Sequence, residues 1–415
     1  QSQQLVQLNQ QKKRSDLYVF HFADEKIIPL SNDTLNVRVS AQQIGNYLMA
    51  TCDESYKIQQ QWKTPGLEDV YRISILDGSI EILAKGLAYP GILSPKGKYF
   101  TYFNPTKNQH VLLDIDAKSI SYMNAYRKDI TWNEDLNGQP MEAGPEGWIG
   151  FDRSEDHVYF KSRYDIWDYQ VSTQNLRSLT NEWATKNKVR MDLVKWESDS
   201  IYIDLIDCYA TSFDVASKKE GLHHFDASQA NGLRPIIDIP ARIYLIERAP
   251  NKNAYFFRWM TVSRYPELEL WNDQLQPQAI LSVTNPQQID YNWATSEIVK
   301  WKAYDGQNLE GILYKPENYD PSKKYPLLLY YYELNSDNLH NYQSPRPSAS
   351  TINPTEYASA GYLVFIPDIR YEIGHPAKSA YNCIMSASDH LIKHFPVDST
   401  RMGLQGQSWG GYQTA

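Results

Sequence analysis

Short alternating strands dominate the first two thirds of this sequence and constrain its fold more than any other feature. From Asp16 to about Asn292, apolar and aromatic runs recur at short intervals, separated by Gly, Pro, Asn and Asp. Such runs are typical of antiparallel β-structure, and no stretch of helical periodicity interrupts them. The segment is therefore expected to form a β-sandwich or a β-propeller. The runs are DLYVFHF, DVYRISIL, SIEILA, KYFTYF, HVLLDI, HVYFKSR, DIWDYQV, SIYIDLI, ARIYLIE, AYFFRWM and LELWN.

Repeated units within this segment favour the propeller. VYRISILDGSIEILAKG, VLLDIDAKSISYMNA and DYQVSTQNLRSLTNE each contain a strand, a short turn and a second strand. They recur about every 40 to 50 residues, which is the length of a propeller blade. At that period residues 1–294 would supply about six blades. We therefore expect an incomplete propeller, with further sequence upstream.

The pattern changes after about residue 295 to alternating strands and helices. YPLLLYYY is a near-continuous apolar run, typical of a strand buried on both faces, and YLVFIPD and RMGLQG are further strands. Between the first two strands, Asn353 can cap a helix that begins at Pro354 and ends at Gly361. SAYNCIMSASDHLIKHF predicts a second, longer helix. Residues 295–415 are thus predicted to form an α/β sheet.

Charge and cysteine content exclude several classes of function. The formal net charge is -8 and the charges are interspersed, so we expect no nucleic-acid partner. Cys52, Cys208 and Cys383 lie far apart and are interpreted as free thiols. His390 and His394 are one helical turn apart, but no carboxylate at metal-site spacing accompanies them, so they are interpreted as surface or helix-end residues. No apolar run reaches the roughly 18 to 20 residues of a membrane span, and a soluble chain without membrane insertion, metal or cofactor is expected.

The segment Gly406–Gly410 matches the pattern G-x-S-x-G and directly follows the last predicted strand. In this motif the serine occupies a tight turn between a strand and a helix, and the glycines are needed because a Cβ would collide with both elements. The motif in this context predicts Ser408 as a nucleophile.

A hydrolase also needs hydrogen-bond donors for the oxyanion of the tetrahedral intermediate. The backbone N–H of Trp409 is one donor by its position after the nucleophile. A second is expected from the tyrosines at the end of the earlier strand, Tyr330, Tyr331 and Tyr332, because a phenol can donate. Two of these three are expected to be packing residues.

The stretch from EIVKWKAYDGQNLEGILYKP through KKYPLLLYYYE, GYLVFIPDIR and RMGLQGQSWGGY resembles the catalytic domain of the prolyl oligopeptidase family of serine peptidases, particularly its dipeptidyl-peptidase and acylaminoacyl-peptidase branches. The resemblance implies a β-propeller followed by an α/β-hydrolase domain, here its N-terminal half. It implies that Ser408 attacks the peptide carbonyl and that Tyr332 is the tyrosine before the oxyanion loop. Asp368 and Arg370 resemble the family's Asp-x-Arg segment and are interpreted as structural.

The sequence also departs from this family. The dipeptidyl-peptidase branch usually continues after its tyrosine with Gly and Pro, where this chain has Glu333, Leu334 and Asn335. The paired glutamates with which that branch holds a substrate's amino terminus have no assigned counterpart. Glu134 and Asp135 are acidic neighbours, but an exposed turn explains them equally well. Aminopeptidase specificity is therefore left open.

The order of the triad in α/β-hydrolases is serine, acid, histidine, and all nine histidines precede Ser408. The acid and the base are expected beyond Ala415, so the 415-residue chain alone is expected not to hydrolyse peptides. The leading hypothesis is a serine peptidase for short peptides, whose propeller would exclude folded proteins, as the resemblance implies.

Two alternatives stay open. One is an esterase or acyl hydrolase on the same fold, because the motif does not distinguish amides from esters. The other is a noncatalytic propeller that binds a partner. The sequence also leaves open the compartment, periplasm or cytoplasm, and the oligomeric state, including a homo-oligomer.

Overall fold

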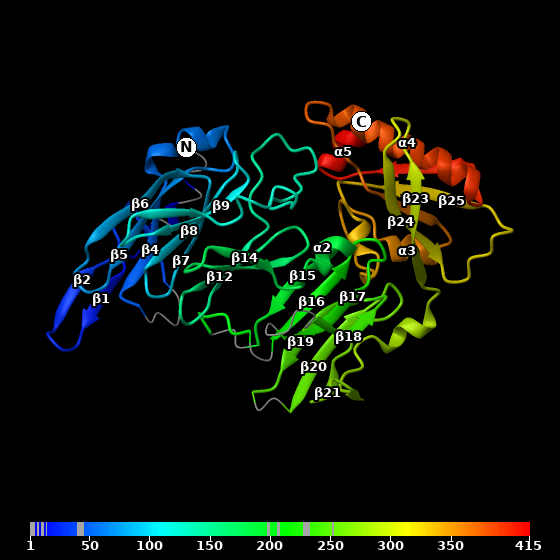
Figure 1. The fold of residues 1–415 in the computed structure, drawn as a ribbon. Coiled ribbons are helices and arrows are strands. Elements are labelled where there is room, and N and C mark those ends of the chain that lie inside the picture. Colours follow the sequence, from blue (N-terminus) through cyan, green and yellow to red (C-terminus); the bar gives the residue numbers. More distant parts are fainter. Residues whose placement is uncertain are drawn as a thin grey trace.

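The structure, a computed structural model, describes residues 15–39, 45–196, 200–205, 208–226, 233–250 and 253–415, together with Leu5, Leu8, Asn9, Lys12 and Lys13. Its first part consists of antiparallel sheets that follow one another along the chain, coloured blue to green in Figure 1. Five of these sheets have four strands, and one further sheet has two. Neighbouring strands in each sheet are consecutive in sequence, because short turns join them.

The small sheet pairs β1 (Tyr18–His21) with β2 (Lys26–Pro29). The five larger sheets are β3 (Asn36–Arg38), β4 (Tyr47–Cys52), β5 (Glu68–Ser74) and β6 (Ile80–Leu87); β7 (Tyr89–Leu93), β8 (Tyr99–Asn104), β9 (Gln109–Asp114) and β10 (Ser119–Tyr122); β11 (Trp148–Phe151), β12 (His157–Lys161), β13 (Ile166–Gln170) and β14 (Asn175–Ser178); β15 (Val189–Val194), β16 (Cys208–Asp214), β17 (Glu220–Phe225) and β18 (Leu233–Ile239); and β19 (Arg242–Arg248), β20 (Ala254–Met260), β21 (Glu269–Asn272) and β22 (Pro277–Ile280).

The apolar cores of this part lie between the faces of successive sheets. Residues from the two facing sheets share each cluster: Val70 with Phe100, Phe103 with Phe160, Ile166 with Met191, and Leu222 with Phe257. A sandwich would bury one core between two sheets, whereas here each sheet packs against the next. The part is therefore a propeller-like domain, as the sequence predicts.

The three similar sequence units each form the third and fourth strands of a sheet: β5–β6, β9–β10 and β13–β14. The described residues of this part contain five four-stranded sheets and one two-stranded sheet, and the long segment 123–147 connects β10 to β11 without adding a sheet. One detail of the sequence prediction is wrong. In SIYIDLI, the described residues 201–205 form no strand; Tyr202 makes only an isolated bridge with Phe151.

The last part of the chain is one mixed sheet of five strands, yellow to red in Figure 1. Its order is β23 (Ala294–Lys302), β24 (Asn308–Pro316), β26 (Leu363–Pro367), β25 (Tyr325–Tyr330) and β27 (Val397–Gln405). β24 pairs antiparallel with β23 and β26, and β25 pairs parallel with β26 and β27. The helices of this part are α3 (Pro354–Ser359), α4 (Pro376–His394) and α5 (Trp409–Thr414).

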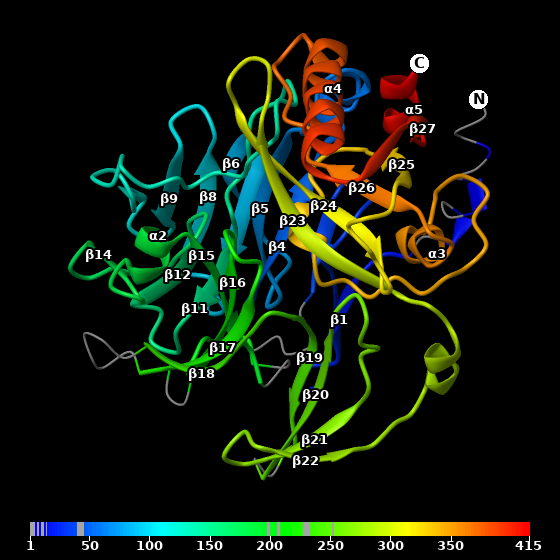
Figure 2. The same cartoon turned by 90° about the vertical axis from the view of Figure 1, so that its right-hand side faces the viewer.

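Helices α3 and α4 cover opposite faces of this sheet (Figure 2). Ala380, Cys383, Ala387 and Leu391 of α4 pack on one face, and Ala358 of α3 packs on the other. The predicted N-cap of α3 is confirmed, because the Asn353 side chain accepts the backbone N–H of Glu356 at 3.1 Å. The remaining short helices are α2 (Trp183–Asn187) and the 3₁₀ turns η1 (Glu54–Tyr56), η2 (Gln59–Gln61), η3 (Pro286–Asp290) and η4 (Ser336–Asn338).

The strand directions bring five strand ends to one edge of the sheet. These are the ends of β23, β25, β26 and β27 and the start of β24. This edge contacts the propeller-like domain, since Asn137 donates to the carbonyl oxygen of Ile369 at 2.9 Å and Lys218 pairs with Glu310 at 2.6 Å. Residues that follow the strands at this edge therefore lie between the two parts of the molecule.

The three cysteines, all within the described residues, form no disulfide bond, and Cys208 and Cys383 are buried. Within the described ranges, no helix combines the length and the apolar character required to cross a membrane.

Candidate active site

Ser408 lies in the turn between β27 and α5. Its backbone has φ 54° and ψ -113°, a combination that residues with a side chain rarely adopt. Such strain costs about 1 to 3 kcal/mol and is concentrated at functional sites. The residue is exposed, so the turn lifts the hydroxyl clear of the sheet edge.

Two glycines make this turn sterically feasible. A Cβ on Gly406 would lie 2.1 Å from the carbonyl oxygen of Gly410, and a Cβ on Gly410 would lie 2.3 Å from the carbonyl oxygen of Tyr331. Both obstacles are backbone atoms, which cannot rotate away as a side chain can. The chain thus meets the steric requirement of the motif at both positions.

The three tyrosines at the end of β25 have different surroundings. Tyr331 is fully buried, with its hydroxyl 3.0 Å from Oγ1 of Thr414, and Tyr330 is half-buried in the cluster under α3. Tyr332 is 38% exposed, and its ring lies 3.8 Å from the position of a Cβ on Gly410. Two of the tyrosines are therefore packing residues, as expected, and Tyr332 lies beside the serine turn.

Trp409 is the first residue of α5, and its backbone N–H makes no hydrogen bond to any residue in the described part of the chain. The first turn of a helix leaves such N–H groups without partners inside the helix. The Trp409 indole stacks on Tyr412, with ring centroids 4.9 Å apart, and its Nε1 donates to the Tyr371 hydroxyl at 2.9 Å. The side chain is therefore anchored while the N–H stays available.

Tyr371 links Tyr332 to helix α5 by hydrogen bonds. It is not among the site residues predicted from the sequence. Its hydroxyl donates to the carbonyl oxygen of Tyr332 at 2.7 Å and accepts from Trp409 and from Nε2 of Gln413. Gln413 also donates to the Tyr332 carbonyl at 2.9 Å. Burial raises the pKa of Tyr371, so the phenol stays protonated and can donate. The loop after β26 thereby fixes α5 relative to Tyr332.

Asp368 holds the chain that follows Tyr332. Its buried carboxylate accepts the backbone N–H groups of Asn335 at 2.5 Å and Ser336 at 2.8 Å, and it also lies 2.6 Å from the Ser336 hydroxyl. Burial raises the pKa of this carboxyl. These contacts agree with the structural role that the sequence interpretation gave to Asp368.

The chain is similar in sequence and in fold to known peptidases. No protein-family model matches the chain. Dipeptidyl peptidase 8 of Mus musculus and that of Homo sapiens are each 29% identical over 133 residues, which cover 29% of this chain and 15% of the relative. Among solved structures, a Bacteroides ovatus protein named as a dipeptidyl aminopeptidase IV has a TM-score of 0.61 at 14% identity, over 97% of this chain and 67% of that one. The fold is that of the prolyl oligopeptidase family.

The structure of dipeptidyl peptidase 4 of Porphyromonas gingivalis is also similar, with a TM-score of 0.60 at 12% identity over 96% of this chain and 62% of that chain. The chain therefore spans 62% to 67% of the length of these two structures. The resemblance to the prolyl oligopeptidase family, inferred above from motifs in the last part of the sequence, is thus confirmed at the level of the fold.

Asp135 lies at the contact between the two parts of the molecule. Its carboxylate accepts from Arg370 at 2.7 Å and lies 3.9 Å from Arg163. In the same loop, Gly138 has a φ of 79°, and a Cβ there would lie 2.3 Å from the carbonyl oxygen of Tyr371. The loop that contains Asp135 and Gly138 thus packs directly against Tyr371. Glu134 makes a backbone hydrogen bond to Gly144 at 2.9 Å.

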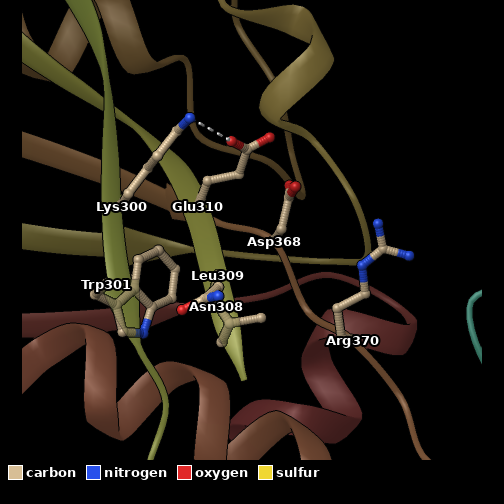
Figure 3. Close-up of a pocket in the computed structure, with 7 residues that line it drawn as sticks. All are labelled: Lys300, Trp301, Asn308, Leu309, Glu310, Asp368 and Arg370. Carbon is tan, nitrogen blue, oxygen red and sulfur yellow. Dashed lines mark ion pairs between the residues drawn. The ribbon is translucent and has the colours of Figure 1, made fainter. Parts of the chain in front are cut away.

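A pocket of about 590 Å³ extends along the same sheet edge (Figure 3). Asp368 and Arg370 line it together with Glu310, whose carboxylate lies 3.8 Å from Nζ of Lys300. The rest of the lining is formed by Trp301, Asn308 and Leu309. Both charge signs line the pocket, so it presents no single-sign surface to a ligand.

All nine histidines lie within the described residues, and none of them hydrogen-bonds to Ser408 there. The surroundings of the histidines differ, because His110 is fully buried among aromatic rings and His394 is exposed at the end of α4. The rings of His390 and His394 lie 4.4 Å apart, and no group of three metal-ligating side chains occurs among the described residues.

Proposed function

We propose that this chain is part of a serine peptidase that hydrolyses short peptides through an acyl-enzyme on Ser408. In this proposal residues 1–294 are propeller blades and residues 295–415 are the N-terminal half of an α/β-hydrolase domain. The observation that carries the proposal is the strained backbone of Ser408 between two glycines that no larger residue can replace. A serine held in this way presents its hydroxyl to a carbonyl group above the sheet edge.

The surroundings of Ser408 support the assignment of the oxyanion donors. The N–H of Trp409 follows the nucleophile directly, and the ring of Tyr332 lies beside Gly410. We propose that this N–H and the Tyr332 hydroxyl stabilise the negative oxygen of the tetrahedral intermediate. Tyr371 acts behind them, because it holds both Tyr332 and Trp409.

Peptide hydrolysis is favoured over ester hydrolysis by the shared fold of the named dipeptidyl peptidases and by the propeller-like domain against the sheet edge. Such a domain would limit access to short, unfolded chains. The comparison of peptide and ester substrates by kcat/KM tests this preference, and a consistently higher value for esters would contradict it.

Labelling with a fluorophosphonate tests the nucleophile itself. The product of the full natural reading frame should form one adduct, which peptide mapping places at Ser408. Ser408→Ala should abolish it. Ser399→Ala is the matched control, because Ser399 is an exposed serine on the same strand, β27. An adduct at another serine, or undiminished labelling of Ser408→Ala, would refute the assignment.

The 415-residue chain by itself is expected to leave peptides intact. Ser408 has no histidine partner among the described residues, and a serine without a base retains only a small part of its rate, with a loss on the order of 10⁴ to 10⁶. Ser408-dependent cleavage by this purified chain would contradict the expectation.

A further inference from the structure

Lys218 lies at the tip of the turn between β16 and β17, on the side of the propeller-like domain that meets the C-terminal sheet. Its φ of 61° belongs to the left-handed region, where glycine is favoured and a lysine is strained. The turn is closely bonded, because the N–H of Lys218 donates to the Asp214 carbonyl at 2.8 Å and the Asp214 carboxylate accepts the N–H of Ser217 at 2.8 Å. A rigid turn thus holds a strained lysine in one orientation.

The ammonium group of Lys218 is buried, and each of its N–H groups has a hydrogen-bond acceptor. The side chain is 1% exposed, and Nζ lies 2.6 Å from Glu310, 2.9 Å from Asp337 and 3.2 Å from the Ser336 hydroxyl. Three acceptors match the three N–H donors of an ammonium group. Burial alone would lower the pKa of Lys218, but its bonds to Glu310 and Asp337 outweigh burial and raise it, so the group stays charged.

The contacts of Lys218 reach the chain that carries Tyr332. Ser336 and Asp337 follow Tyr332 by only a few residues, and no regular element separates them from it. Asp368 holds the N–H groups of Asn335 and Ser336 from one side, and Lys218 holds Ser336 and Asp337 from the other. The segment 333–337 therefore has its far end fixed jointly by the sheet and by the propeller-like domain.

Charge makes Lys218 hard to replace at this point. The carboxylates of Glu310 and Asp368 lie 3.0 Å and 2.6 Å from the Ser336 hydroxyl, and those of Glu310 and Asp337 share Nζ of Lys218. Like charges so close repel one another. The other cations nearby, Arg190 and Lys300, are 42% and 61% exposed, so water screens them more strongly than it screens Lys218. Without the Lys218 charge, repulsion would push Asp337 and the segment before it away from the sheet edge.

We propose that Lys218 of the propeller-like domain is a positioning residue that sets the place of Tyr332 through the segment 333–337. The catalytic consequence rests on the proposed function of Ser408 and Tyr332. Because Lys218 belongs to the propeller-like domain, the contact of this domain with the sheet controls whether the Tyr332 hydroxyl lies where it can stabilise the oxyanion.

The test compares Lys218→Met with Lys219→Met in the product of the full natural reading frame. The methionine keeps the length of the side chain and removes its charge. Lys219 is the matched control. It is the next residue in the same turn, but its side chain is 41% exposed, and its one ion pair among the described residues is with the exposed Asp238, at 3.3 Å. Lys218→Arg restores a positive charge at the site and serves as the rescue.

Two quantities are measured: kinact and KI for fluorophosphonate labelling of Ser408, and hydrogen exchange of the backbone amides. For Lys218→Met we expect kinact to fall roughly 10- to 100-fold, the loss typical of a donor displaced by about 1 Å, with KI changed less than about threefold. The amides of Asn335 and Ser336 should lose protection while β24 and β26 keep theirs. Lys219→Met should match the wild type, and Lys218→Arg should recover part of kinact.

An unchanged kinact in Lys218→Met, or equal losses in Lys218→Met and Lys219→Met, would overturn the proposal. If the backbone amides of Lys218→Met lose protection from hydrogen exchange throughout β24 and β26, the sheet itself is disturbed. The test then uses Asp337→Asn instead, since this variant removes one charge and keeps the shape of the side chain. An unchanged kinact in Asp337→Asn would then also overturn the proposal, and a selective fall in kinact would support it.

The two proposals fail differently. If the wild-type protein is not labelled at Ser408, the proposed function is wrong, whatever the Lys218 variants do. Hydrogen exchange at Asn335 and Ser336 then still decides whether Lys218 holds the segment. If the wild type is labelled and only the Lys218 result fails, the inference falls and the function stands.

Discussion

His110 shows how strongly a single residue can depend on its surroundings. It is fully buried, neither ring nitrogen has a hydrogen-bond partner among the described residues, and the rings of Trp148 and Phe160 lie 4.6 Å and 4.4 Å away. Burial lowers its pKa from 6.5 to about 3. The unfolded chain therefore binds a proton below pH 6.5 that the folded chain rejects until about pH 3.

Stability linked to His110 is complete above pH 6.5 and is lost as the pH falls toward 3. One proton corresponds to about 1.4 kcal/mol per pH unit, so the loss at pH 5 is about 2 kcal/mol. We expect His110→Leu to remove this part of the pH dependence. Urea denaturation at pH 7 and pH 5 measures it, with exposed His394→Leu as the control. The same pH dependence in wild type and His110→Leu would contradict the prediction.

Gly410 and Gly411 are neighbours in α5 with opposite steric environments. A Cβ on Gly410 meets the Tyr331 carbonyl oxygen at 2.3 Å, whereas the nearest atom to a Cβ on Gly411 is the Gly406 carbonyl oxygen at 3.5 Å. We expect Gly410→Ala to reduce fluorophosphonate labelling of Ser408 by about 100-fold, because the turn must shift, and Gly411→Ala to keep it within about threefold. Equal labelling rates in the two variants would mean that the turn adapts.

At the scale of elements, the loop after β26 acts on two other elements through one hydroxyl. Tyr371 bonds to the Tyr332 carbonyl after β25 and to Trp409 and Gln413 in α5. Tyr371→Phe keeps the ring and removes these bonds. We expect kcat to fall about tenfold, since α5 and Tyr332 are then held only by packing, while KM stays within about threefold.

Tyr381→Phe is the matched control for this experiment. Tyr381 lies on α4, is 64% exposed and makes no hydroxyl hydrogen bond to a described residue. Steady-state kinetics on one peptide substrate compares the two variants. If Tyr371→Phe had the kcat of Tyr381→Phe, the hydroxyl would not position the site.

At the scale of the whole molecule, exposed ion pairs between the two parts are expected to be weak. Asp135 and Arg370 are 2.7 Å apart but 42% and 43% exposed. A double-mutant cycle with Asp135→Asn and Arg370→Met should give a coupling in the free energy of unfolding of about 0.5 kcal/mol, and less in 1 M salt. A coupling above about 2 kcal/mol would show that this pair, and not buried Lys218, dominates the contact.

Local patterns in the sequence determined much of the structure. Asn353 caps α3 as predicted, because a cap needs only the N–H three residues further on. The glycines around Ser408 were likewise predictable, since the turn is confined to a few consecutive residues. Alternating apolar residues in the first part and near-continuous apolar runs in the last part located most strands and the difference in architecture. SIYIDLI is the counterexample, because its described residues form no strand despite their strand propensity, and Tyr202 makes an isolated bridge with Phe151.

Only the tertiary structure decided which residues meet at the sheet edge. Asn137 and Ile369 are 232 positions apart, and Lys218 and Asp337 are 119 apart, yet both pairs are in contact. No local pattern encodes such a pair, because each residue satisfies its own turn or loop independently. The roles of Tyr371 and Lys218 follow from the docking of the propeller-like domain on the sheet, which depends on many long-range contacts formed together when the chain folds.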